Sequence, residues 1–218
     1  MSSIDNAVFS RRSVRKYLNL PVERHFISQI LESGAHAPSS GNLQNWKVII
    51  VQNPEIRQKI AQASFHQLWM SQAPVHIVIC ADTKVASQFY GKRGEMLYSV
   101  QNCAAMAQTM ILKATELGFG TCWVSAFDEV KLKVVLALPD SIRPQTIITL
   151  GHADEVTPAP LLKDPSDYIT FDTYANKNDP LTKDLQFKNV GNLNRRMVQG
   201  AGNIISDIVG EFKKIFRK

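Results

Sequence analysis

Cysteine is scarce in this sequence, and histidine never occurs in a metal-binding pattern. The three cysteines, Cys80, Cys103 and Cys122, are an odd number without paired spacing, and each lies among apolar residues. We therefore expect buried free thiols rather than disulfides, which fits a chain that works in the reducing cytoplasm. The five histidines are scattered along the chain without the spacing of metal ligands, so we expect no metal site.

Long apolar runs and nucleotide-binding loops are missing as well. No apolar run reaches the ~20 residues that a membrane-spanning helix needs, and the first residues lack the basic and apolar stretches of a secretory signal. There is no Walker loop. Gly118-Phe119-Gly120 is not a dinucleotide fingerprint, because it follows a helical pattern and Trp123 occupies the position of the third glycine. No Ser/His/Asp or Cys/His catalytic set can be recognised in the sequence.

The surplus of positive charge lies at the C-terminal end. The 218 residues carry 25 Lys and Arg against 19 Asp and Glu, a formal net charge of +6, and residues 183–218 contribute eight of these cations and three of the anions. Residues 1–182 are therefore nearly neutral and have the length of one globular domain. We expect a main domain over residues 1–182, a basic extension over residues 183–218, and no nucleic-acid partner.

The basic extension carries an amphipathic pattern. Alternating spacings of three and four predict a helix with one apolar face, made by Val198, Ala201, Ile205, Ile208, Phe212 and Ile215. Cations at the end of this helix suit its dipole. One interpretation is that the helix packs on the domain or on a partner subunit. The alternative is peripheral contact with an anionic membrane surface or with a partner protein.

The rest of the sequence alternates helical patterns with short apolar runs. Apolar spacing, caps and breakers predict helices over residues 4–11, 21–35, 54–63, 65–72, 95–117 and 128–138. Apolar runs predict strands over residues 48–51, 75–81, 122–124 and 145–151, the first of them buried on both faces. We expect Val8 and Phe9 to face the core and residues 89–94 to be irregular. We expect the helix over 95–117 to be buried on almost all of its faces, and its small residues would allow a helix of a second subunit to approach closely. This order of elements predicts an α+β domain with helices on both sides of a mixed sheet.

Two polar stretches interrupt this pattern. In residues 38–45 (PSSGNLQN), Pro38 biases the preceding backbone away from helix, Gly41 permits a positive φ, and five side chains offer donors and acceptors. Held between a helix end and a strand, this loop could grip a ligand, and the alternative is a plain surface turn. Residues 11–17 (RRSVRKY) gather four cations and a hydroxyl, which suits either an anion site or a solvated basic turn.

Taken together, the two stretches resemble the nitroreductase family of FMN-dependent oxidoreductases. The family pattern is roughly Arg-x-Ser-x-Arg near the start, followed later by Pro-Ser-x-x-Asn-x-Gln-x-Trp running into a strand. Arg11, Ser13 and Arg15 match the first part, residues 38–46 match the second, and further matches continue to about Lys163. The resemblance implies a three-layer α/β/α sandwich with a mixed, mainly antiparallel sheet. It also implies a homodimer with shared active sites.

The resemblance further implies how each part of FMN would be held. Arg11 and Ser13 match family positions at the phosphate and ribityl end, and Arg15 matches a position near the N1–O2 edge of the ring. Arg12 could add a cation for the phosphate. Lys163 lies near a point where the family usually has a basic residue for the phosphate, and the alternative is an exposed loop lysine. The residue near the N3–O4 edge would be Gln67, beside His66. The residues against the ring, with a backbone N–H facing N5, would be Val124, Ser125 and Ala126. The residues reaching across the dimer interface to the partner's flavin would be Pro38, Ser39, Ser40 and Asn42.

The reaction that the resemblance implies is a ping-pong hydride transfer. NAD(P)H would reduce the flavin, and an electron-poor acceptor such as a nitroaromatic, a quinone or an enone would then be reduced on the same face. We identify no catalytic side chain. One alternative keeps the fold but cleaves flavin or removes halide reductively, with substrate-gripping residues in the lid over 82–94. Another alternative is a flavin-binding or membrane-tethered interaction protein with little turnover, which only the basic extension supports.

Overall fold

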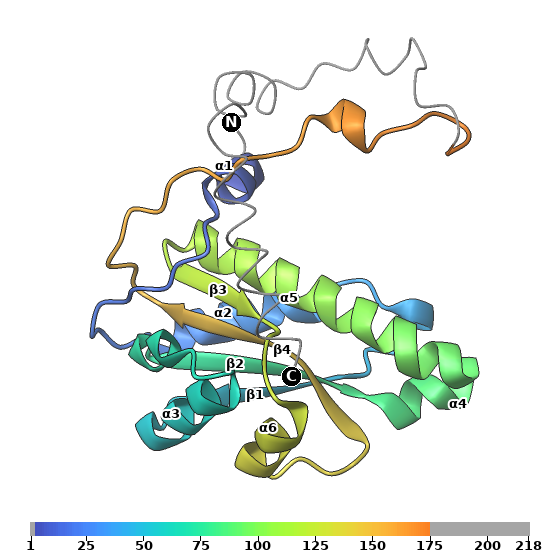
Figure 1. Cartoon of the computed structure of the whole chain (residues 1–218), viewed down its shortest axis with the longest axis horizontal. Coiled ribbons are helices and arrows are strands. Elements are labelled where there is room, and N and C mark those ends of the chain that lie inside the picture. The colour runs from blue at the N-terminus through green and yellow to red at the C-terminus, as the bar shows by residue number, and fades with distance from the viewer. Residues whose placement is uncertain (1–2, 175–218) are drawn as a thin grey trace. The chain divides into compact units, whose positions relative to one another are not determined.

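The computed structural model describes residues 3–174 (Figure 1). The chain separates into two compact units, residues 1–158 and residues 159–218. Of the second unit, the described part contains one 3-10 turn, Pro165–Asp167. The predicted boundary after residue 182 and the predicted amphipathic helix lie outside the described residues, so both stay predictions.

A four-stranded antiparallel sheet forms the centre of the first unit. Its strands are β1 (Trp46–Val51), β2 (Val75–Asp82), β3 (Gly120–Val124) and β4 (Ile142–Gly151), in the order β1-β2-β4-β3. Every strand pair is antiparallel, and the parallel pairing seen in the described residues is a single bridge between Ser13 and Thr121. The two central strands, β2 and β4, are buried over most of their length because they are covered on both faces.

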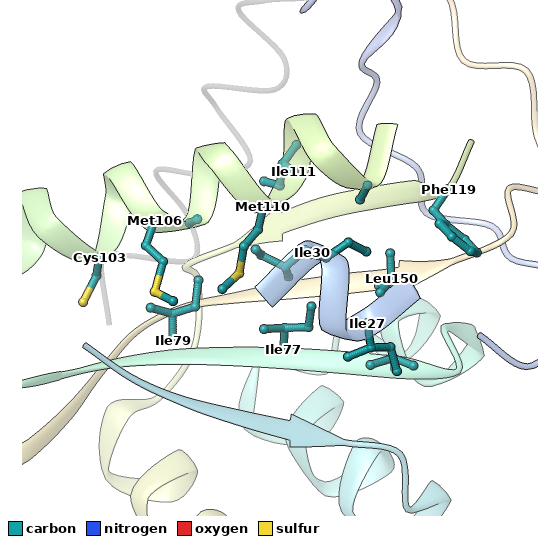
Figure 2. Close-up of a cluster of buried hydrophobic side chains, with 14 of the residues drawn as sticks. Ile27, Ile30, Ile77, Ile79, Cys103, Met106, Met110, Ile111, Phe119 and Leu150 are labelled. Atoms are coloured by element: carbon teal, nitrogen blue, oxygen red, sulfur yellow. The ribbon is translucent and has the colours of Figure 1, made fainter. Parts of the chain in front are cut away.

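Helices cover both faces of this sheet, which confirms the predicted α+β three-layer sandwich. Side chains alternate along β2, so Ile77 and Ile79 face α2 (Arg24–Ala35) and α5 (Ser99–Glu116), as Figure 2 shows. Val78 and Cys80 face the other way, toward α3 (Pro54–Ala63) and α6 (Glu129–Leu136). All three cysteines are free and buried, as predicted.

Capping side chains fix where several helices begin. The Asn53 side chain accepts hydrogen bonds from the N–H groups of Glu55 and Ile56, and Pro54 follows it at the first helical position, so α3 begins where the sequence predicts. Asp128 caps α6 in the same way through the N–H of Lys131. Helix α6 ends at Leu136, two residues before the predicted end, because Ala137 adopts a left-handed conformation.

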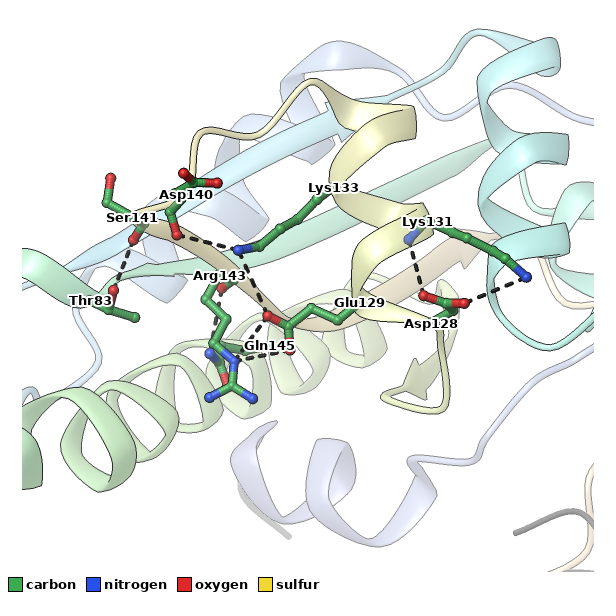
Figure 3. A network of polar contacts seen from close by, with 9 residues as sticks. All are labelled: Thr83, Asp128, Glu129, Lys131, Lys133, Asp140, Ser141, Arg143 and Gln145. Carbon is green, nitrogen blue, oxygen red and sulfur yellow. Dashed lines mark hydrogen bonds and ion pairs between the residues drawn. The ribbon is translucent and has the colours of Figure 1, made fainter. Parts of the chain in front are cut away.

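A polar network ties the start of α6 to β4 (Figure 3). Arg143 Nε donates to both carboxylate oxygens of Glu129, at 3.2 and 3.0 Å. Lys133 Nζ lies 3.9 Å from the same carboxylate and donates to the carbonyl of Asp140 at 3.3 Å. The end of β3 runs directly into α6, so this network helps to fix residues 124–128, which the next subsection describes.

Two predictions about exposure are wrong at the ends of the unit. Val8 and Phe9 on α1 (Ser3–Ser10) do not face the core: they are 47% and 46% exposed, and Ala7 is the buried residue. Strand β1 is not buried on both faces, because it lies at an edge of the sheet and its fully buried residue is Val51. Apolar spacing reports which residues avoid water, and it does not report whether a neighbouring chain covers them.

The segment between β2 and α5 also differs from the prediction. Residues 83–93 form helix α4 (Thr83–Arg93), which Asp82 caps through the N–H of Val85, so most of the stretch 89–94 that we expected to be irregular is helical. Gly91 interrupts the helix with φ +54°, and a π-helical turn, Gly94–Tyr98, leads into α5. The predicted all-round burial of the next helix is also wrong, because Met96 and Val100 are exposed.

Two kinds of feature are absent from the described part of the chain. Within residues 3–174, every helix falls short of the length and apolarity that crossing a bilayer requires. The same residues contain no group of three or more His, Cys, Asp or Glu side chains placed to hold a metal ion.

Candidate functional site

The cationic segment, residues 11–17, lies along the edge strand β3. Ser13 bridges to Thr121, and the N–H of Val14 donates to the carbonyl of Thr121 at 2.9 Å. Tyr17 holds the segment on β4: its hydroxyl donates to the carbonyl of Val14 at 2.6 Å and lies 2.7 Å from Thr149 Oγ1. Burial raises the pKa of the Tyr17 hydroxyl. This hydroxyl is therefore a neutral structural anchor rather than an acid or base.

Residues 152–155, just after β4, fix the other side of the cationic segment. The carbonyl of His152 accepts from the N–H of Leu18, at 2.9 Å. Glu155 Oε1 accepts from the backbone N–H groups of Arg15 and Lys16, at 2.5 and 3.0 Å. The backbone of residues 13–18 is thus held from both sides, which sets the directions in which its cationic side chains leave it.

Two of the predicted phosphate-side residues, Arg11 and Ser13, lie near Cys122 of β3 together with Arg15, which is predicted to face the N1–O2 edge. Burial raises the pKa of the Cys122 thiol, and the positive charges of Arg15 and Arg11 oppose that rise, as does a hydrogen bond from Ser13. Arg15 also lies over the ring of Trp69, 5.8 Å from its centroid. Arg11, Ser13 and Arg15 therefore form one cluster of donors at the β3 edge of the sheet.

Arg12 is oriented differently from the other two arginines. Its Nη1 donates to the carbonyls of Phe9 and Arg11, each at 2.8 Å. The same residue lines a cavity of about 210 Å³ that Glu155 and Thr157 also border. Part of the Arg12 guanidinium is thus committed to the backbone at the end of α1, and its role toward a phosphate stays a prediction.

Gln67 is joined to the segment that follows β3. Its Nε2 donates to the carbonyls of Ser64 and Ala126, at 3.0 and 3.1 Å. The N–H of Asp128 donates to the carbonyl of Ala63 at 2.8 Å, so the two segments are linked twice. Because both N–H bonds of the Gln67 amide are committed, its Oε1 is the atom that this side chain can offer to a ligand donor.

The residues after β3 offer their backbone rather than their side chains. Ser125 Oγ accepts from Trp123 Nε1 at 2.7 Å and lies 3.4 Å from the carbonyl of Gln145. Val124 is buried, and Ser125 is exposed. This arrangement suits the expectation that the backbone N–H near Ser125 or Ala126, and not a hydroxyl, would meet a bound ring.

The polar loop, residues 38–45, is a rigid turn with unusual backbone conformations. Gly41, Asn42 and Gln44 have φ values of +56°, +56° and +47°. Ser39 holds the turn: its Oγ accepts from the N–H of Gln44 at 3.0 Å, and its carbonyl accepts from the N–H of Asn42 at 2.9 Å. Left-handed residues other than glycine cost free energy and are concentrated at binding sites. This geometry favours the ligand-binding interpretation over a plain surface turn.

The two halves of the predicted site lie at opposite edges of the sheet. The polar loop leads into β1 at one edge, and the cationic segment is bonded to β3 at the other, with β2 and β4 between them. A single chain therefore brings Arg11, Ser13 and Arg15 together at one edge and keeps Pro38–Asn42 at the other. Lys163 belongs to the second unit, so its predicted role stays a prediction.

Sequence reasoning missed two residues that organise these halves. Glu155 holds the cationic segment, and Asn102 on α5 holds the polar loop by accepting from the N–H and Oγ of Ser40, at 2.9 and 3.2 Å. A signal existed for Asn102, because it and Ser99 are uncharged polar residues in a helical stripe that is otherwise apolar. Glu155 had none, since it contacts backbone groups that are 139 and 140 residues away in the sequence.

Replacing Gly41 with alanine is expected to lower the free energy of unfolding by roughly 1–2 kcal/mol, the penalty for a left-handed residue with a Cβ. The new Cβ would also lie 2.4 Å from the Tyr90 hydroxyl, so that side chain would have to move. Gly118 is the matched control, since its φ is +84° but nothing lies within 4 Å of an added Cβ. Urea unfolding of both variants measures the difference. A Gly41→Ala variant more stable than Gly118→Ala would show that Tyr90 does not pack on the loop.

Comparison with known proteins places this arrangement in one family. The profile described as the nitroreductase family matches residues 8–72 and 65–152. A putative NADH dehydrogenase/NAD(P)H nitroreductase of Archaeoglobus fulgidus is 30% identical over 149 residues, covering 66% of this chain and 82% of the relative. An FMN reductase [NAD(P)H] of Bacillus subtilis is 30% identical over 201 residues, covering 85% and 80%.

A solved structure agrees with these sequence matches. The hypothetical oxidoreductase YcnD of Bacillus subtilis superposes with a TM-score of 0.72 at 28% identity, covering 80% of this chain and 75% of that one. The family profile spans both the cationic segment and the polar loop, as well as the whole sheet. The chain belongs to the nitroreductase family.

Proposed function

We propose that this protein is an NAD(P)H-dependent FMN oxidoreductase that works as a homodimer with two shared active sites. The observation that carries the proposal is the meeting of Arg11, Ser13, Arg15, Gln67 and residues 124–126 at one edge of the sheet. The names of two similar proteins include FMN. These are the FMN reductase [NAD(P)H] of Bacillus subtilis and an FMN-dependent nitroreductase of Clostridium difficile, which is 25% identical with a TM-score of 0.66.

The donor set at the β3 edge fits FMN chemically. Arg11 and Ser13 supply a cation and a hydroxyl for a phosphate, and their backbone is already fixed by Thr121 and Glu155. Gln67 offers Oε1 as an acceptor for a ring N–H, and the backbone near Ala126 offers a donor. Arg15 brings positive charge, which would stabilise negative charge at the N1–O2 edge of the ring.

The chemistry and the binding are divided between cofactor and protein. Bound FMN would supply the two-electron chemistry, taking a hydride from NAD(P)H and reducing an electron-poor acceptor such as a nitroaromatic, a quinone or an enone. The chain's own residues bind and orient: Arg11 and Ser13 at the phosphate, Arg15 and Gln67 at the ring edges. One site that serves the donor and the acceptor in turn predicts ping-pong kinetics.

The dimer follows from where the polar loop lies. Pro38–Asn42 sits at the β1 edge, so these residues could contact FMN only in the site of another subunit. Exposed apolar side chains on α1, which packs on α5, in the π-helical turn before α5 and at the start of α5 are available to contact that subunit: Ile4, Val8, Phe9, Met96 and Val100. A second copy would cover them, which explains why the apolar pattern of α1 points away from the core of its own chain.

The first experiment is an absorption spectrum of the purified protein before any cofactor is added, followed by denaturation to identify the released flavin. We expect flavin bands, FMN in the supernatant, and bleaching on mixing with NADH or NADPH under anaerobic conditions. Return of the bands on adding a quinone or a nitroaromatic would complete the ping-pong cycle. A colourless protein that also takes up no added FMN would overturn the proposal.

A further inference from the structure

A chain of buried polar side chains connects the polar loop to helix α5. Its members are Asn45, Ser99 and Asn102, which are 3%, 0% and 3% exposed. Asn102 Nδ2 donates to Asn45 Oδ1 at 2.8 Å, and Asn45 Nδ2 donates to Ser99 Oγ at 3.0 Å and to the carbonyl of Asp82 at 3.1 Å. Ser99 Oγ in turn donates to the carbonyl of Gly94 at 3.0 Å.

These hydrogen bonds determine which way the Asn102 amide faces. Two acceptors, Ser99 Oγ and the carbonyl of Asp82, hold the Nδ2 of Asn45, so its Oδ1 must face Asn102. Asn102 then presents Nδ2 to Asn45 and Oδ1 to Ser40, where it accepts from both the N–H and the hydroxyl. A buried polar network with every member satisfied specifies one geometry, because any other orientation leaves a group unpaired.

The loop needs such an anchor because its backbone is held in sparsely populated conformations. Gly41, Asn42 and Gln44, directly after Ser40, all have positive φ. Residues in this region persist only where their surroundings hold them. Asn102 on α5 is the side chain that holds Ser40, directly before these left-handed residues, by accepting from both its N–H and its hydroxyl.

We propose that Asn102 is a positioning residue, which holds Ser40 and with it the loop Pro38–Asn42 in the conformation that meets the FMN of the partner subunit. The proposal rests on the proposed function. It adds that Asn102 fixes the conformation of the loop, and that this conformation determines the affinity for FMN. Asn102 touches no cofactor itself and acts through Ser40.

Three substitutions separate positioning from a general loss of stability. Asn102→Leu keeps the volume but leaves Ser40 and Asn45 unpaired. Asn102→Asp keeps an oxygen for Ser40 while setting its second oxygen against Asn45. Ser99→Ala is the matched control, since it removes a buried hydrogen bond from the same network but leaves Asn45 held by the carbonyl of Asp82. The measurements are the thermal midpoint and the FMN dissociation constant, from quenching of flavin fluorescence on the dimeric protein.

We expect all three variants to lose thermal stability. Asn102→Leu should raise the FMN dissociation constant by about tenfold, the effect of losing one good contact, whereas Asn102→Asp and Ser99→Ala should stay near the wild type. Should the leucine variant fail to fold, Asn102→Ala, which leaves room for a bridging water, takes its place. Equal FMN affinity in Asn102→Leu and Ser99→Ala would overturn the proposal, as would an Asn102→Asp variant as weak as Asn102→Leu.

The failure of this proposal can be told from failure of the proposed function. Arg11→Ala, measured in parallel, reports the phosphate end of the site and does not involve Asn102. If Arg11→Ala loses FMN affinity and Asn102→Leu does not, the positioning role is wrong and the FMN site stands. If neither substitution changes FMN affinity, both the proposed FMN site and the positioning role of Asn102 are wrong.

Discussion

Replacing Arg11 with alanine is expected to weaken FMN binding by about 1.5–3 kcal/mol, the range for one lost charge-assisted hydrogen bond. Arg11 stands with Ser13 and Arg15 around Cys122, on a backbone fixed by Thr121 and Glu155, so its guanidinium is already placed when the ligand arrives. Ser13→Ala should act in the same direction with a smaller effect, because the hydroxyl is uncharged. Titration of the apoprotein with FMN measures both dissociation constants.

The matched control for Arg11 is Arg24, an exposed arginine at the first position of α2. Arg24→Ala removes the same charge and the same side chain from a position outside the cluster, so FMN affinity should not change. If Arg24→Ala weakened FMN binding as much as Arg11→Ala, the effect would be one of net charge. Unchanged affinity in both Arg11→Ala and Ser13→Ala would place the phosphate elsewhere.

Acid is expected to destabilise the fold through His76. This histidine lies on β2 with no exposed surface, and its Nε2 bonds to the carbonyl of Met70 at 2.8 Å. Burial lowers its pKa to about 4, the hydrogen bond opposes this shift, and the nearby positive charge of Arg57 adds to it. The unfolded chain has a histidine pKa of about 6.5, so between pH 6.5 and 4 it binds a proton that the native state does not. Stability is therefore complete above pH 6.5 and falls as the pH drops through this window.

The expected loss of unfolding free energy from His76 is about 2 kcal/mol between pH 7 and pH 5. Urea unfolding at the two pH values measures it, and His76→Gln, which can still donate to the Met70 carbonyl, should lose less stability over the same interval. His36→Gln is the control, because His36 is exposed at the end of α2. Equal pH dependence in the wild type and His76→Gln would show that His76 is not the group responsible.

Most of the fold could be predicted from local signals. The cap at Asn53, the apolar runs of β2 and β4 and the glycines after α5 each act within a few residues, and each element formed near its predicted place. Helix α4 was missed because glycines at 91 and 94 argue against a helix. Tertiary packing overrides that signal: an added Cβ at Gly94 would lie 2.2 Å from the carbonyl oxygen of Ala86, so a residue without a side chain lets the two turns meet.

The candidate site could be predicted only where a motif carries it. Arg11, Ser13 and Arg15 belong to a short pattern, and the structure places them together around Cys122. Glu155 and Asn102, which hold the two halves, bond to backbone groups from distant parts of the chain, and no spacing rule reports such contacts. The exposed apolar residues of α1 could not be placed from the sequence either, because a pattern of apolar residues does not indicate which chain covers them.

The central claim is that each FMN lies between the cationic segment of one subunit and the polar loop of its partner. The most direct test pairs two variants in one mixed dimer, with distinct affinity tags for purification. One chain carries Arg11→Ala. The other carries Asn42→Asp, which keeps a residue type that tolerates the left-handed conformation and places negative charge on the loop.

We expect FMN to bind weakly to each variant homodimer. In the mixed dimer, one site combines both defects, and the other combines an intact cationic segment with an intact loop. Titration with FMN should therefore show half of the sites binding with wild-type affinity. If the segment and the loop of one chain served the same site, each site would carry one defect, and no site with wild-type affinity would be found. That second result would contradict the account.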